Sequence, residues 1–112
     1  MKLLYAILLY LTGQILVWFQ TNGQFINDWA KDHPLAMAFF FSTPISYAFI
    51  HATRLSAEYY DGLLWPGRLV GFACGMFAFY TMTYAFLGEG LTPKTALTLL
   101  LAGTIMLIQI FL

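Results

Sequence analysis

Four apolar stretches, each long enough to cross a bilayer, follow one another along this chain with short polar segments between them. A membrane-spanning helix needs about 20 mostly apolar residues, because each residue adds about 1.5 Å along the helix axis. The chain is therefore predicted to be one all-α integral membrane domain over residues 1–112, with short loops and antiparallel hairpins. Its four transmembrane helices are expected at about residues 3–20, 34–53, 66–87 and 93–112.

The charge content agrees with a membrane location. Charged residues make up 9% of the chain and hydrophobic residues 61%. Soluble domains carry about 25% charged residues, so this chain lacks the polar surface that a soluble monomer needs. The formal net charge is zero, and nothing in it indicates nucleic acid as a partner. The lipid bilayer is the first partner that the composition predicts, with the chain crossing it several times.

Three glycines lie four residues apart at the start of the third apolar stretch: Gly67, Gly71 and Gly75. Positions i, i+4 and i+8 share one face of an α-helix, so the three form a stripe without side chains. Small residues at this spacing are typical of contacts between membrane helices, where association depends on close van der Waals packing. The glycine stripe is predicted to be a helix-packing face that the backbone of another helix approaches closely.

The basic residues give only a weak preference for one orientation in the membrane. Lys2, Arg54 and Arg68 lie on the side of the two chain ends, while Lys31 and Lys94 lie on the opposite side. The positive-inside rule then places both ends in the cytoplasm, by a difference of one residue. Because this bias is so small, the orientation stays open. Insertion in both orientations, and hence an antiparallel dimer, is one hypothesis that it permits.

Gln14 is the main polar side chain deep in an apolar stretch, about two-thirds of the way along the first. It shares a helix face with Tyr10, Leu11 and Trp18, which lie three or four residues away. Polar side chains inside a membrane are unfavourable and often functional. Gln14 either forms a hydrogen bond with another helix or contacts a substrate, and both interpretations stay open. No carboxylate lies deep in any of the four stretches, which argues against a proton relay.

Arg68 lies a few residues into the third apolar stretch. A long basic side chain near a helix end can extend back to the membrane surface along its own apolar stem. Asp61 or Glu58 would then be its ion-pair partner. The alternative is that Arg68 binds an anion.

The sequence contains no arrangement typical of catalysis. There is no nucleophile with an adjacent base, no phosphate-binding loop and no pair of cysteines, since Cys74 is the only cysteine. His33 and His51 have no partner at the spacing of metal ligands. We therefore expect no enzymatic activity, no cofactor and no metal site.

Three short motifs carry a resemblance to a known family. Residues 8–25 read LLYLTGQILVWFQTNGQF, the third stretch opens with Trp65-Pro66-Gly67, and FLGEGLT at residues 86–92 precedes the apolar last stretch. The first segment is similar in layout to the first helix of the small multidrug resistance family, which carries a buried glutamate. The second resembles the Trp-Ser-Gly of that family. The third resembles a hairpin common in the drug/metabolite transporter superfamily, so the chain resembles a four-helix member of that superfamily.

The resemblance implies a small membrane transporter in a bacterial-type inner (plasma) membrane. Such a protein works as a homodimer, with a pocket for a small organic solute between its subunits. The substrate-binding residues that it implies here are Gln14, Trp18 and Trp65. Gln14 stands where the family has its proton-coupling glutamate, and an amide does not titrate, so transport is expected not to be proton-coupled through Gln14. The stretch from Trp65 to Gly88 is longer than in the drug exporters.

A function of another class fits the same sequence. The chain is then a non-transporting membrane subunit or regulator. It docks on another membrane protein through the stripe of Gly67, Gly71 and Gly75. The two functions differ in assembly, because detergent-solubilised protein that stays monomeric under every lipid condition would favour the docking role.

Overall fold

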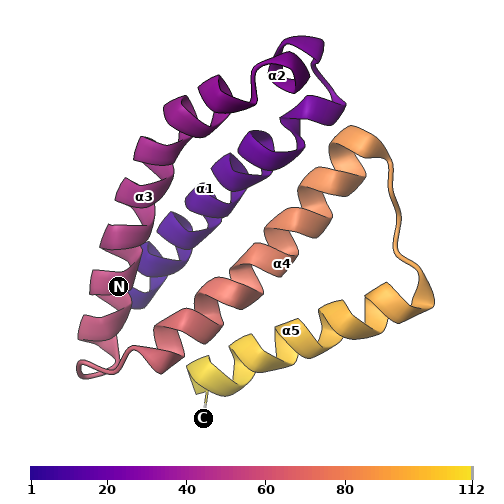
Figure 1. Cartoon of the computed structure of the whole chain (residues 1–112). Helices are drawn as coiled ribbons and strands as arrows, with labels where there is room; N and C mark the ends of the chain where they lie inside the picture. The colour runs from indigo at the N-terminus through magenta and orange to yellow at the C-terminus, as the bar shows by residue number, and fades with distance from the viewer. Residues whose placement is uncertain (112) are drawn as a thin grey trace.

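The computed structural model describes residues 1–111 and consists of helices joined by short bends (Figure 1). Its elements in chain order are α1 (Lys2–Asn22), the 3₁₀ turn η1 (Gly23–Phe25), α2 (Asp28–Asp32), α3 (Pro34–Tyr59), α4 (Trp65–Leu87) and α5 (Pro93–Phe111). The four long helices, α1, α3, α4 and α5, have the length and apolar composition of membrane spans. The prediction of an all-α protein with four transmembrane helices is confirmed.

The helix ends differ from the expected ones mainly in α3, which continues past Thr53 to Tyr59. The apolar pattern stops at Arg54, but the helix does not, because Ser56 in the next turn is buried against α1 and α4. The last helix was expected to reach Leu112, which lies outside the described residues. Packing, rather than hydropathy, therefore sets the end of α3.

The helices form a thin layer instead of a closed bundle. α1 lies between α3 and α4 and packs on both, while α5 leans mainly on α4 (Figure 1). The Cα atoms span 45 × 36 × 19 Å, and a single helix with its side chains is about 10 Å across. A layer this thin leaves α1 accessible along the line where α3 and α4 diverge.

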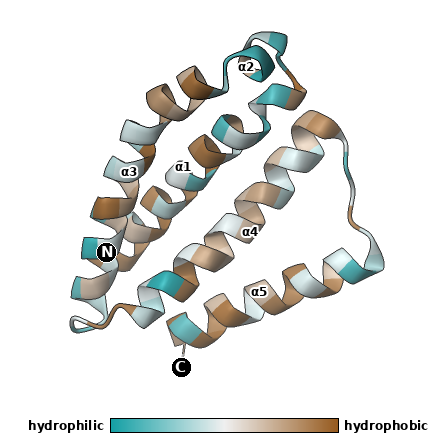
Figure 2. Ribbon diagram, in the orientation of Figure 1, coloured by the Kyte–Doolittle hydropathy of each residue, from teal (hydrophilic) through white to brown (hydrophobic). Residues whose placement is uncertain are grey.

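Small residues fill the interior of this layer. Ala6, Ala52 and Ala73 have no exposed surface, and Gly13 of α1 faces the ring of Phe49 on α3. Such residues let helices approach closely, which is the main source of helix association in lipid. The outward side is apolar, and hydrophobic residues predominate along α5 while hydrophilic residues gather around α2 (Figure 2).

Tyr60, in the bend after α3, holds α5 against the rest of the chain. Its phenol donates a hydrogen bond of 2.9 Å to the backbone carbonyl of Gln109. Burial raises the pKa of Tyr60, and the adjacent Tyr59 raises it further. The phenol therefore keeps the proton that it donates throughout the physiological pH range.

Replacing Tyr60 by phenylalanine removes only this bond, so Tyr60→Phe is expected to lower the free energy of unfolding by about 0.5–1.5 kcal/mol. Thermal unfolding in dodecyl maltoside, followed by circular dichroism, measures the change. Tyr59→Phe is the matched control, because Tyr59 is more exposed. Equal melting temperatures for the two variants would contradict the role given to Tyr60.

Candidate functional site: a groove along α1

Two cavities open along the side of α1, and together they are called here the α1 groove. The larger is lined by α1, α3 and α4, and the smaller by α1 and α4 alone. The larger has a volume of about 460 Å³ and the smaller about 190 Å³. Gln14 and Phe72 line both cavities and mark the boundary between them. The larger cavity extends from this boundary toward the bend between α3 and α4, and the smaller extends toward the other end of α1. The groove is thus continuous along α1 except at Gln14.

With α1 crossing the bilayer, Gln14 is expected close to the middle of the membrane. It is twelve residues into α1, or about 18 Å along the axis of a helix, and the apolar core of a bilayer is about 30 Å thick. Its amide packs on Gly75 of α4, where an added Cβ atom would lie 2.9 Å from both Cδ and Nε2 of Gln14. α4 therefore supports the Gln14 side chain from one side and leaves its amide facing the cavities.

The Gln14 amide has no hydrogen-bond partner within residues 1–111. The side chains of α1 that form hydrogen bonds with other helices are Tyr10, Trp18 and Gln20 instead, and Lys2 forms an ion pair with Glu58 of α3. The first interpretation of Gln14 required a hydrogen bond with another helix, and residues 1–111 contain no such bond. An amide in the apolar layer of a bilayer is unfavourable without a partner, so the geometry leaves a place for one in the groove.

The glycine stripe faces α1 and forms part of the groove floor. Atoms of Tyr10 lie closest to Gly71, those of Gln14 closest to Gly75, and Ser56 Oγ and Tyr10 Oη are near Gly67. Tyr10 and Ser56 also share a buried hydrogen bond of 3.1 Å. The stripe is a packing face within the chain. The atoms that enter it are side-chain atoms, where the sequence predicted the backbone of another helix.

Trp18 holds α1 to the far half of α4. The side chain is 2% exposed, and Nε1 donates a hydrogen bond of 2.9 Å to Thr83 Oγ1. Its ring centroid lies 5.4 Å from that of Phe86. Trp18 is one turn beyond Gln14 and lines the smaller cavity, so the structure brings these two predicted site residues together.

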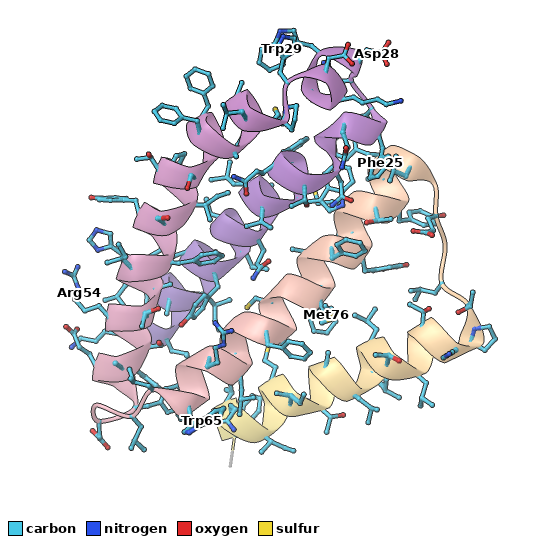
Figure 3. All side chains as sticks on the ribbon, in the orientation of Figure 1. Phe25, Asp28, Trp29, Arg54, Trp65 and Met76 are labelled. Atoms are coloured by element: carbon cyan, nitrogen blue, oxygen red, sulfur yellow. The ribbon has the colours of Figure 1, made fainter. Side chains whose placement is uncertain are left out.

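Trp65 lies apart from Gln14 and Trp18. Its side chain is 76% exposed at the start of α4 (Figure 3), and it is not among the described residues that line the α1 groove. Gly67 faces α1, and a position two residues away in a helix is rotated by about 200°. The side of α4 that carries Trp65 therefore points away from α1, and the structure does not place Trp65 in a shared pocket with Gln14.

The sequence interpretation considered Arg68 as an anion-binding residue but missed the residues that form the rest of the walls of the larger cavity. Phe49 and Thr53 of α3 face Phe72 and Arg68 of α4 across it. One signal was available for α4, since Arg68 and Phe72 each follow a glycine of the stripe by one residue. No comparable signal marks Phe49 or Thr53, because their position depends on how α3 packs on α1.

Arg68 lines the larger cavity, and its expected ion pair is not formed. Glu58 pairs with Lys2 at 3.1 Å, a contact between exposed side chains. Within residues 1–111 neither Glu58 nor Asp61 forms a salt bridge with Arg68. Arg68 therefore lines the cavity as an exposed side chain, and no carboxylate of residues 1–111 forms a salt bridge with it.

No group of three His, Cys, Asp or Glu side chains in the described part of the chain is arranged to hold a metal ion. The groove instead offers hydroxyl, amide and guanidinium groups between aromatic walls. Comparison of the chain with protein-family models finds no match, and comparisons with curated proteins and with solved structures find none either.

Proposed function

We propose that this protein is a small membrane transporter that moves a small organic solute along the α1 groove. The observation that carries the proposal is the Gln14 amide, which lies at mid-membrane between two cavities without a hydrogen-bond partner in residues 1–111. A polar solute in the groove would supply the missing hydrogen bonds. The resemblance to the small multidrug resistance family supports the same function and a bacterial-type inner membrane as its location.

The proposed transporter is a homodimer, because one chain leaves the groove open on one side. Ser42 and Ser46 are exposed, and their spacing puts them on the same face of α3 as Phe49 and Thr53, which line the groove. A second copy lying over this side would cover the hydroxyl groups and enclose the groove. The two copies are parallel or antiparallel according to how the chain inserts.

Transport through Gln14 requires no proton coupling, since an amide neither gains nor loses a proton at ordinary pH. Movement of the solute is then facilitative, or coupled by a group other than Gln14. The rate is expected to show no titration that depends on residue 14.

The test is solute flux into liposomes that contain the purified chain. The probes are radiolabelled benzenesulfonate, trimethylphenylammonium and mannitol, which are an anion, a cation and a neutral solute. Saturable flux of at least one probe is expected above that of protein-free liposomes. Gln14→Leu keeps most of the side-chain volume but removes the amide, so flux at low solute concentration should fall about tenfold, as for the loss of one hydrogen bond of about 1.4 kcal/mol.

Gln109→Leu is the matched control. Gln109 is an amide of α5 that lies outside the lining of the α1 groove, and its backbone carbonyl still accepts the bond from Tyr60 in the variant. Flux should be unchanged in this variant. Absence of saturable flux for all three probes, or equal flux in wild type and Gln14→Leu, would refute the transport proposal.

Two further measurements address the dimer. Mass measurement of the protein in lipid nanodiscs should give two copies, and a monomer under every lipid condition would exclude the homodimer. Reporters active only in the cytoplasm or only outside, fused separately to the C-terminus, then give the orientation. Comparable signals from both would mean an antiparallel dimer, and signal from one alone would mean a parallel one.

The alternative, docking on another membrane protein through the glycine stripe, needs that stripe to be accessible. In the structure Tyr10 and Gln14 of α1 and Ser56 of α3 lie against it. Docking would therefore require α1 to move away from α4. Transport along the α1 groove requires no such separation, and for this reason it is the function that we propose.

A further inference from the structure

The larger cavity of the α1 groove has a basic residue at its mouth. Arg68 is only three residues into α4, or about 5 Å along the helix axis, so it lies near the membrane surface. Gln14 lines the same cavity at its deeper end. The cavity therefore connects a surface cation with an amide at mid-membrane.

The polar groups that line this cavity are suited to an anion. They belong to Arg68, Gln14, Thr53 and Tyr10, and no carboxylate is among the described residues that line it. A cationic solute would meet the Arg68 guanidinium with no negative group to offset the repulsion. An anionic group can instead accept charge-assisted hydrogen bonds from Arg68, which are about twice as strong as those between neutral groups.

The remaining walls are apolar. Phe49 of α3 and Phe72 of α4 line the cavity together with Leu64, and the space of about 460 Å³ lies in the size range of small-molecule sites, about 300–1,000 Å³. This space is also partly open to the outside of the chain. A fitting occupant has a polar end at Arg68 and an apolar part that extends between the two phenylalanines.

We infer that the α1 groove selects a small amphiphile with an anionic head group and an apolar body. The head group first binds the Arg68 guanidinium, with the body between Phe49 and Phe72. As the solute moves along the groove, the head group then accepts a hydrogen bond from the Gln14 amide. This names the solute class of the transporter proposed above and rests on that proposal for its role in transport. The same chemistry has two sources, a water-soluble organic anion and an anionic phospholipid.

Equilibrium dialysis of the purified chain in dodecyl maltoside tests the anion site. The two probes are benzenesulfonate and trimethylphenylammonium, which carry permanent charges of opposite sign on the same ring. Benzenesulfonate should bind more tightly than the cation. Arg68→Gln should weaken its binding about tenfold or more, as for the loss of a charge-assisted hydrogen bond, and Arg68→Lys should restore part of it.

Arg54→Gln is the matched control for charge. Arg54 lies near the same end of the helix layer, on the outer side of α3 (Figure 3), where Nη2 contacts Nδ1 of His51 at 2.7 Å. Its removal should leave benzenesulfonate binding unchanged. Because Arg68 is exposed, the substitutions at position 68 remove little packing, and equal melting temperatures for the variants verify this.

Native mass spectrometry distinguishes the two sources. The chain is taken up from vesicles of phosphatidylglycerol or of phosphatidylcholine, and retained lipid is counted. Retention of phosphatidylglycerol in wild type and Arg54→Gln, but not in Arg68→Gln, supports the inference with a lipid as the ligand. Binding of benzenesulfonate with the same dependence on Arg68 supports it with a soluble anion.

The inference is overturned if neither anion depends on Arg68, or if trimethylphenylammonium binds as tightly as benzenesulfonate. Neither result contradicts the transport proposal, provided that flux still depends on Gln14. The opposite outcome also distinguishes the two proposals. Anion binding that depends on Arg68, without flux of any probe, supports the inferred site and refutes transport.

Discussion

Replacing Trp18 by alanine is expected to lower the free energy of unfolding by about 3–5 kcal/mol, the range measured for buried large aromatic side chains. Trp18 is 2% exposed and lies between α1 and α4, with Phe86 beside its ring. The substitution leaves an unfilled space at this contact. It also leaves the buried Thr83 hydroxyl without the indole N–H that now bonds to it.

The packing and hydrogen-bond contributions can be separated. Trp18→Phe keeps an aromatic ring and removes the N–H, while Thr83→Val removes the acceptor. A double-mutant cycle on this pair should give a coupling of about 0.6 kcal/mol, the average for hydrogen bonds between membrane helices, and at most about 1.7 kcal/mol. The greater part of the loss in Trp18→Ala is therefore expected to come from packing.

Unfolding by sodium dodecyl sulfate in mixed micelles, followed by circular dichroism, measures these differences. Trp29→Ala is the matched control, because Trp29 is 53% exposed in α2 (Figure 3). It should unfold at nearly the wild-type detergent fraction. If Trp18→Ala unfolds together with Trp29→Ala, the contact between α1 and α4 does not depend on Trp18 as the structure indicates.

The four helices were predictable because the thickness of the bilayer sets the length of an apolar stretch. The ends of these helices were less predictable. Arg54 and Glu58 interrupt the hydropathy of α3, yet the helix continues to Tyr59 because Ser56 packs on Tyr10 and Gly67. That contact joins residues 46 positions apart, and no local pattern reports it.

The candidate site was predictable only in part, for a similar reason. Gln14 is marked by its polarity within an apolar stretch, and this signal needs no knowledge of the fold. The ion pairs depend on the fold. Proximity in sequence favoured a pair between Glu58 and Arg68, whereas in the structure Glu58 pairs with Lys2. Trp65 was assigned, from a resemblance, to a pocket between two subunits. Its position two residues before Gly67 turns it away from α1 of its own chain, and its place in a dimer stays a prediction.

Replacing Gly71 by leucine is expected to disrupt the packing of α4 on α1. A Cβ atom at Gly71 would lie 3.1 Å from Tyr10 Cε1, and the rest of a leucine side chain would overlap the ring. Overpacking of this kind costs about 1–3 kcal/mol and occasionally more. The higher helix propensity of leucine offsets up to about 1 kcal/mol of it. Gly71→Ala should be close to neutral, because the same offset opposes a smaller overlap.

The measurement is again unfolding in mixed micelles, with Ala85→Leu as the matched control. Ala85 is an exposed residue of α4, so its replacement adds similar bulk on the outer side and should change stability little. Gly71→Leu should unfold at a lower detergent fraction and lose flux of every transported probe. Alanine and leucine have nearly the same helix propensity, so equal stability of Gly71→Leu and Gly71→Ala would mean that the stripe does not pack on Tyr10.

The same variant separates the two functions. If the glycine stripe packs within the chain, Gly71→Leu damages the fold first and every activity follows from that damage. If the stripe is a docking surface, Gly71→Leu abolishes binding of the partner while the isolated chain keeps its stability. Tyr10 decides between these outcomes, because it is buried against Gly71 in the first case and must move away in the second. Stability and flux measured on one preparation of Gly71→Leu therefore test the internal packing on which the α1 groove depends.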